Sequence, residues 1–200
     1  MKAIKTIGLA ALTALMAMAF LGASSAMAEN TQLCQTKPNP CVVPVTSMLE
    51  ESVGKAKLLT SFGTTECNVL FSTSSVGALG APQKIVGTFT YINCELVKGA
   101  CTVVEENGTA VLEVLREGHE KAKVTYKFLI HVVCGKILDC SYTGTNLVGT
   151  ATGPELSTQP NGEVALLGQE MTKEAGGFLC PKSTKLDITT TPSSAIYINL

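Results

Sequence analysis

The sequence predicts an all-β protein, an antiparallel β-sandwich or open barrel of about ten to twelve short strands that disulfides staple together. Two observations support this prediction. Apolar residues recur at every second position in several stretches, which is the period of a strand with one buried face. Glycine, proline and Asn-Gly pairs separate these stretches at short intervals. A parallel β-helix is one alternative fold, which the lack of a strict short repeat disfavours. A membrane β-barrel is another, which four expected disulfides and mixed strand lengths disfavour.

The clearest strand lies in residues 121–140, KAKVTYKFLIHVVCGKILDC. From the first alanine onward, one register is apolar and the other is mostly polar. A period of two places these registers on opposite faces of a strand. We therefore expect Phe128 and Ile130 to be buried, and Lys123 and Lys127 to be exposed.

Turn signals mark the ends of the other strands. Asn107-Gly108 lies between two β-rich runs and predicts a tight hairpin, because a type I′ turn needs positive φ at both central residues. Residues 47–57, SMLEESVGKAK, have helical composition, and Gly54 limits them to a turn or two. The other strands are expected at residues 55–62, 66–73, 85–94, 102–106, 109–115, 141–143, 147–152, 163–171, 186–191 and 195–199.

Residues 1–28 are predicted to be a secretory signal peptide. Two lysines, Lys2 and Lys5, precede an apolar run over residues 7–20, and small residues end in Ala26-Met27-Ala28. This order is typical of a cleaved leader. The apolar run is shorter than the roughly 20 residues of a membrane-spanning helix, which argues against an N-terminal anchor. We expect cleavage after Ala28, which leaves residues 29–200 as a single secreted, extracellular β-domain.

All eight cysteines lie beyond the predicted leader. An even number behind a signal peptide is typical of disulfides in an oxidising compartment. The chain has no C-x-x-C and only two histidines, so disulfides are favoured over a metal site. Three pairs lie close in sequence and are expected to clasp short loops, which leaves the last two cysteines for each other. The predicted disulfides are Cys34–Cys41, Cys94–Cys101, Cys134–Cys140 and Cys67–Cys180.

The charge of the chain limits the classes of partner. Two of the 15 basic residues lie in the leader, so the rest of the chain is mildly acidic. A nucleic-acid-binding domain would carry a basic face, so we expect no nucleic-acid partner. The same charge gives no attraction to anionic membranes once the leader is removed. A cell-surface or extracellular ligand stays open as the partner.

The side chains that could carry chemistry are few. His119 is expected at a hairpin tip between glutamates, and His131 on the polar register of its strand, where Asp139 or Asp187 could pair with it near a serine. The chain has no G-x-S-x-G elbow, no phosphate loop and no tryptophan for a sugar platform. We therefore assign no catalytic, cofactor-binding or metal-binding residue and expect no cofactor. Whether the protein is an enzyme stays open, with a non-enzymatic role favoured.

The cysteine spacings carry a resemblance. The chain has a leader, a C-x6-C arm at residues 34–41, NC-x6-C at residues 93–101, VVC-x5-C at residues 132–140, and Leu-Cys-Pro at residues 179–181. This order resembles a group of secreted, cysteine-bearing bacterial proteins that are rich in β-structure. The resemblance covers most of the chain after the leader. That group carries no assigned activity, so the resemblance implies no functional residues.

A disulfide framework without a constellation of reactive groups favours a non-enzymatic extracellular module with a structural or binding role. One alternative is a secreted hydrolase that uses His131 or His119, which requires a pocket joining one of them to a serine or a carboxylate. Another alternative is a secreted protease inhibitor that presents a clasped loop such as Cys94–Cys101.

Overall fold

The computed structural model describes most of the chain after the predicted leader. The leader and its cleavage site lie outside the described residues, and within the strands the side chains of residues 96, 101 and 104–108 are not described. The described stretches are residues 30–37, 40–61, 63–96, 101–136 and 138–199.

The described residues form eleven strands and no helix, which confirms the all-β class. They therefore contain no helix with the length and apolarity to span a membrane. The strands are β1 (Gln32–Cys34), β2 (Leu49–Ser52), β3 (Ala56–Thr60), β4 (Gly63–Val76), β5 (Gln83–Leu96), β6 (Cys101–Gly118), β7 (Lys121–Cys134), β8 (Leu138–Thr152), β9 (Glu163–Gly176), β10 (Ser183–Pro192) and β11 (Tyr197–Asn199).

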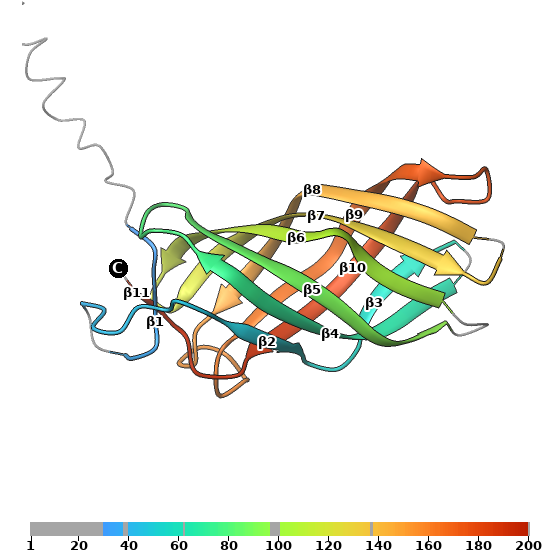
Figure 1. Cartoon of the computed structure of the whole chain (residues 1–200). Helices are drawn as coiled ribbons and strands as arrows, with labels where there is room; N and C mark the ends of the chain where they lie inside the picture. The colour runs from blue at the N-terminus through green and yellow to red at the C-terminus, as the bar shows by residue number, and fades with distance from the viewer. Residues whose placement is uncertain (1–29, 38–39, 62, 97–100, 137, 200) are drawn as a thin grey trace, which may run out of the picture.

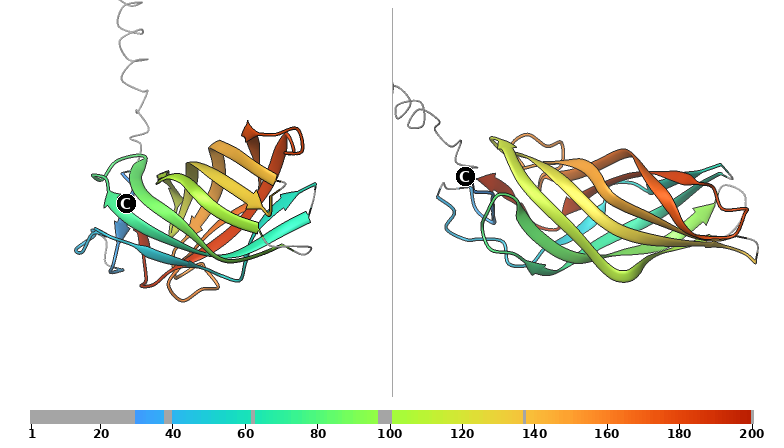
Figure 2. Two further views of the ribbon diagram at one scale, coloured as in Figure 1. Left: turned by 45° about the vertical axis from the view of Figure 1, so that its right-hand side comes forward. Right: turned by 90° about the horizontal axis from the view of Figure 1, so that it is seen from above.

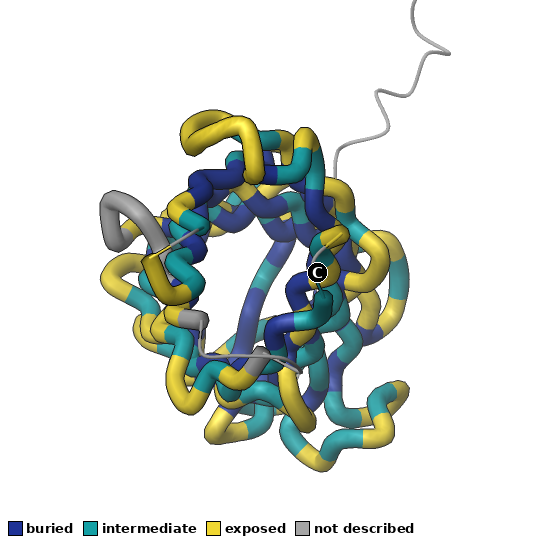
Figure 3. The backbone as a smooth tube through the Cα atoms, turned by 90° about the vertical axis from the view of Figure 1, so that its right-hand side faces the viewer, coloured by how far each residue is buried: buried dark blue, intermediate teal, exposed yellow. Residues whose placement is uncertain are grey.

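Eight strands close into an antiparallel barrel (Figure 1). β3 to β10 pair with their neighbours in chain order, and β10 returns to pair with β3. β2 occupies the same place in the wall as β3, nearer the other end, because it also pairs with both β10 and β4. Seen from one end, the wall forms a ring (Figure 3). The predicted sandwich or open barrel is therefore corrected to a closed barrel, in which each wall strand has two neighbours.

β7 follows the alternation that its sequence predicts. Phe128 and Ile130 are buried inside the barrel, whereas Lys123 and Lys127 are exposed on its outer face. Both predictions are confirmed. The apolar register lines the interior because a closed sheet has one face turned toward a common core.

Aromatic side chains fill the middle of the barrel. The ring of Phe89 lies 4.7 Å from that of Phe71, 5.4 Å from Phe128 and 6.0 Å from Tyr126, measured between centroids. Gly87 makes room for this cluster, since a Cβ at that position would collide with the ring of Phe71. Side chains rather than a wide channel therefore occupy this part of the barrel.

Two local predictions are wrong. Residues 47–57 form β2 and the start of β3 instead of helical turns, because pairing with β4 and β10 outweighs a weak helical propensity. Asn107-Gly108 does not form a hairpin, because it lies within the continuous strand β6. The register between β6 and β7 shifts between Glu106 and Val111, so the extra residues form a bulge in the strand.

The disulfide map is confirmed at one pair, Cys34–Cys41, and corrected elsewhere. Cys67 is bonded to Cys94, because the paired strands β4 and β5 bring their Cα atoms to 4.1 Å. The predicted pairs Cys67–Cys180 and Cys94–Cys101 are therefore wrong.

Cys140 is bonded to Cys180, with 5.7 Å between Cα atoms, so the predicted Cys134–Cys140 pair is wrong too. The reason lies in the register of β7 and β8, where Cys134 is opposite Leu138 rather than Cys140. Cys134 is itself disulfide-bonded, and its backbone lies opposite that of Cys101 on β6.

The two ends of the barrel differ (Figures 1 and 2). At one end, which we call the plug end, β1 pairs with β11. Leu33 of β1 and Ile198 of β11 line the same interior cavity as wall residues, so this pair covers the opening. At the other end, which we call the rim end, the connection between β9 and β10 projects beyond the wall (Figure 1).

Candidate functional site

Both histidines lie within hydrogen-bond distance of a carboxylate. His119 follows β6, and its Nε2 lies 2.6 Å from Oε2 of Glu155. His131 lies on β7, and its Nε2 lies 2.6 Å from Oδ1 of Asp139 on β8. The predicted pairing of His131 with Asp139 is confirmed, whereas Asp187 instead accepts a hydrogen bond from the backbone N–H of Gly168.

A serine also lies near His131, but the three groups do not form a catalytic triad. Ser141 is directly opposite His131 in the register of β7 and β8, so both side chains lie on the same face. A triad needs a hydrogen bond from the serine to the histidine and a place for substrate. Among the described residues, no such bond joins Ser141 to His131, and neither histidine lines any of four cavities located there.

Glu155 joins three segments at the plug end. Its Oε1 contacts Nζ of Lys37, which lies in the Cys34–Cys41 arm, and its Oε2 contacts His119. The hydrogen bonds from Lys37 and His119 lower the pKa of Glu155 below its ordinary value. The contacts of Glu155 with Lys37 and His119 hold the arm in place. They are not a metal centre, since the described residues contain no cluster of three or more metal-ligating side chains.

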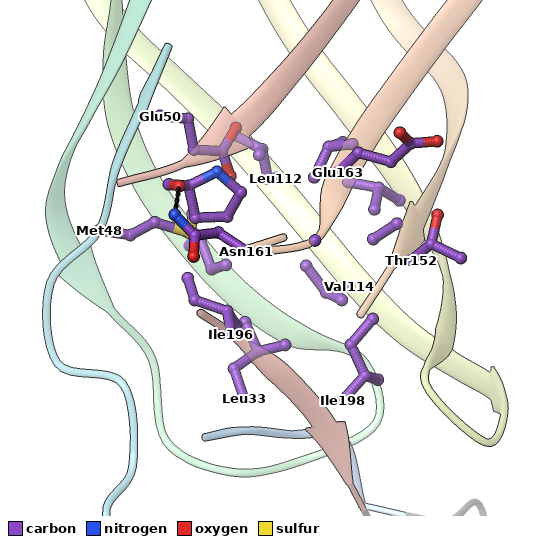
Figure 4. A pocket seen from close by; sticks show the side chains of 16 residues that line it. Leu33, Met48, Glu50, Leu112, Val114, Thr152, Asn161, Glu163, Ile196 and Ile198 are labelled. Carbon is purple, nitrogen blue, oxygen red and sulfur yellow. Dashed lines mark hydrogen bonds between the residues drawn. The ribbon is translucent and has the colours of Figure 1, made fainter. Parts of the chain in front are cut away.

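A cavity of about 40 Å³ lies inside the barrel beneath β1 and β11. Figure 4 shows Leu33, Ile196 and Ile198 on the plug side, with Leu112 and Val114 of β6 along the wall. Pockets for small molecules usually measure about 300–1,000 Å³, so this space by itself has room only for a few water molecules.

Glu50 is the buried acid of this cavity (Figure 4). It lies on β2 opposite Phe71, and it is 1% exposed. Thr190 of β10 donates a hydrogen bond to its Oε2. Burial raises the pKa of Glu50 to about 7, against the smaller opposing effect of the Thr190 hydrogen bond. A buried carboxyl group without a cationic partner destabilises a fold, which makes Glu50 a candidate binding group.

A hollow of about 400 Å³ lies outside this cavity. Met48, Pro192 and Ile196 line both spaces, so they form the wall between them. The rest of the lining is mostly polar, with hydroxyl or amide groups from the arm, the segment before β2, β4 and the segment between β10 and β11. These side chains are Gln35, Ser47, Ser72, Thr73, Ser193 and Ser194.

Glu120 is a second buried acid at the plug end. It is 1% exposed, has a φ of 50°, and its Oε1 accepts the N–H of Ile198 on β11. Burial raises the pKa of Glu120 above its ordinary value. Gly153 has no space for a side chain, because a Cβ there would overlap the Glu120 carboxyl group. Glu120 thus ties β11 to the wall at the start of β7.

The rim end carries an exposed aromatic side chain on an anchored turn. The N–H of Cys180 donates a hydrogen bond of 3.1 Å to the carbonyl of Gly177, and Cys180 is bonded to Cys140 on β8. Gly176 precedes this turn with a φ of 120°, and a Cβ there would collide with Sγ of Cys180. Phe178 lies within the turn and is 94% exposed.

Sequence analysis did not identify Glu50 or Phe178. Glu50 lies in the segment that was predicted to be helical, where nothing in the local pattern indicates an inward-facing acid. Phe178 had a usable signal, since Phe178-Leu179 lies between Gly-Gly and Cys-Pro, and both of these pairs favour turns. An apolar pair inside a turn predicts an exposed apolar side chain.

The functional assignment of these groups therefore depends on their geometry. Comparison of the chain with protein-family models, with curated proteins and with solved structures found no match.

Proposed function

We propose that the protein is a non-enzymatic extracellular binding module that attaches to a cell-surface protein through the rim turn, residues 177–180. The observation that carries this proposal is the 94% exposure of Phe178 on a turn that a hydrogen bond and a disulfide hold in place. The disulfides of the barrel are consistent with an oxidising extracellular environment.

The turn has the physical properties of a binding anchor. A phenylalanine side chain buries about 150–250 Å² when a partner covers it, and aromatic anchors carry much of the energy of protein interfaces. The disulfide between Cys180 and Cys140 limits the motion of the turn, so less conformational entropy is lost on binding. The expected partner surface is an apolar pocket that accepts one ring.

The two alternative functions have less support. The hydrolase needs a histidine in a cleft, and neither His119 nor His131 lines the cavities described above. The inhibitor was expected to present a Cys94–Cys101 clasp, and Cys94 is bonded to Cys67 instead. The backbone hydrogen bond from Cys180 to Gly177 folds the rim turn back on itself. A protease binds an extended segment, so the rim turn does not fit a protease inhibitor either.

The test measures retention of labelled protein on the cells that secrete it. Phe178→Ser should weaken binding by roughly tenfold or more, as expected for an aromatic anchor at the centre of an interface. Leu167→Ser is the matched control, because Leu167 is 61% exposed but lies on the wall strand β9. Unchanged binding of the Phe178 variant, or an equal loss in both variants, would contradict the proposal.

A further inference from the structure

We infer that the plug end holds a separate binding site for a small hydroxylated primary amine, formed by the outer hollow together with the cavity that contains Glu50. The site shares no residue with the rim turn, so it can be tested independently of the proposed attachment through Phe178. Three features of the site support this inference: its charge, its hydrogen-bonding groups and the wall that separates the two spaces.

The charge of the lining selects a cation. Among the described residues that border the two spaces, Glu50 and Glu163 are acidic, and none is a lysine, arginine or histidine. Figure 4 shows the Glu50 carboxyl group at the cavity, whereas the Glu163 carboxyl group points away from it and accepts a hydrogen bond from Thr158. An ammonium group placed beside Glu50 would supply the opposite charge that this buried carboxylate lacks, while an anion would be repelled.

The outer hollow matches a hydroxylated, uncharged body. Its polar side chains are hydroxyls and one amide, which can each donate or accept hydrogen bonds without favouring a charge. The hydroxyl of Thr73 is buried and has no hydrogen-bond partner among the described residues. Thr73 lines the hollow, and a rotation of its side chain toward the hollow would let a ligand hydroxyl pair with it, which stabilises a buried polar group.

The wall between the spaces can open by side-chain motion. Met48 borders both spaces and lies two positions before Glu50 in the chain (Figure 4). Methionine is unbranched and changes rotamer easily, so it adapts to different neighbours. If Met48 swings aside, the ammonium group reaches Glu50 while the hydroxylated body stays in the 400 Å³ hollow, whose size is that of a small-molecule pocket.

The experiment uses D-glucosamine as the probe and N-acetylglucosamine as its uncharged counterpart, both tested on the full-length secreted protein at pH 7. Calorimetry measures the affinity, and the NMR signal of the Met48 methyl group reports contact at the wall. Glucosamine should bind at least roughly tenfold more tightly, because acetylation removes the charged hydrogen bond to Glu50. No binding of glucosamine, or equal binding of both sugars, would overturn the inference.

Variants separate the two halves of the site. Glu50→Gln should weaken glucosamine binding roughly tenfold or more, and Ser72→Tyr should abolish it by filling the hollow. Glu51→Gln is the matched control for charge, because Glu51 is the exposed neighbour on the same strand. Thermal unfolding confirms that each variant is folded. Unchanged affinity in Glu50→Gln would overturn the role of Glu50.

Discussion

At the plug end the barrel buries two carboxyl groups, those of Glu50 and Glu120, whereas at the rim end it leaves Phe178 almost fully exposed. The wall between the ends follows the ordinary rule, with apolar side chains inside and polar side chains outside, as β7 illustrates. The two ends therefore depart from that rule in opposite directions.

This difference is the reason for proposing a binding site at each end. A buried acid and an exposed aromatic ring each lower the stability or solubility of a fold, and proteins keep such features mainly at functional sites. At the plug end Glu50 borders a cavity, which fits the small-molecule site inferred there. The rim end has the chemistry of a contact with a macromolecule, since its ring projects on an anchored turn.

The largest expected effect compares the disulfides of the two ends. Cys140 and Cys180 are 40 residues apart, whereas Cys34 and Cys41 are 7 apart. On the chain-entropy model, replacing the rim pair with alanine should lower the free energy of unfolding by about 4 kcal/mol, and replacing the plug pair by about 2.4 kcal/mol. Urea unfolding of the two double variants measures this order. A plug pair that contributes more than the rim pair would contradict it.

The next effect concerns the buried acid of the plug end. The folded pKa of Glu50, about 7, lies above the ordinary value of 4.5, so the folded state holds this proton more tightly than the unfolded state. The contribution of Glu50 to the free energy of unfolding is therefore most favourable below pH 4.5 and is lost as the pH rises toward 7. The loss should reach about 3 kcal/mol above pH 7.

Glu50→Gln should remove this loss, so the variant should exceed the wild type in stability at pH 8 by up to about 3 kcal/mol and match it near pH 4. Chemical unfolding at both pH values measures the difference. Glu51→Gln, which changes the exposed neighbour, should leave the pH dependence of the wild type intact. Equal pH dependence in Glu50→Gln and the wild type would show that this carboxyl group is not buried.

The smallest effect concerns the rim turn. Phe178→Ser should change the free energy of unfolding by no more than about 0.5 kcal/mol, because the ring makes almost no contact that folding would lose. Thermal unfolding of the variant tests this expectation. A loss of several kcal/mol would mean that the ring packs against the barrel, and the attachment proposed through this turn would fail with it.

The sequence predicts the wall better than the ends, and the reason is physical. Alternation along β7 is a local pattern, so its buried face can be assigned without knowing its neighbours. β2 is only four residues long and is stabilised by pairing with β4 and β10, which are distant in sequence. Local composition therefore suggested a helix there.

The disulfides were misassigned for a related reason. Nearness in sequence does not imply nearness in space here, because strand pairing brings Cys67 beside Cys94, and the connection after β9 brings Cys180 to Cys140. The inward orientation of Glu50 depends on the same long-range pairing. The disulfide pairing and the orientation of Glu50 can therefore be assigned only from the closed topology of the barrel. The alternation pattern of the sequence does not specify that topology.

The most direct test of the account is an NMR titration of the side-chain carboxyl carbon of Glu50 in the folded protein, assigned by comparison with Glu50→Gln. The account predicts a midpoint near pH 7, because the group is buried inside the barrel with Thr190 as its hydrogen-bond donor. A midpoint near the ordinary value of 4.5 would contradict the burial of Glu50 at the plug end with no cationic partner among the described residues.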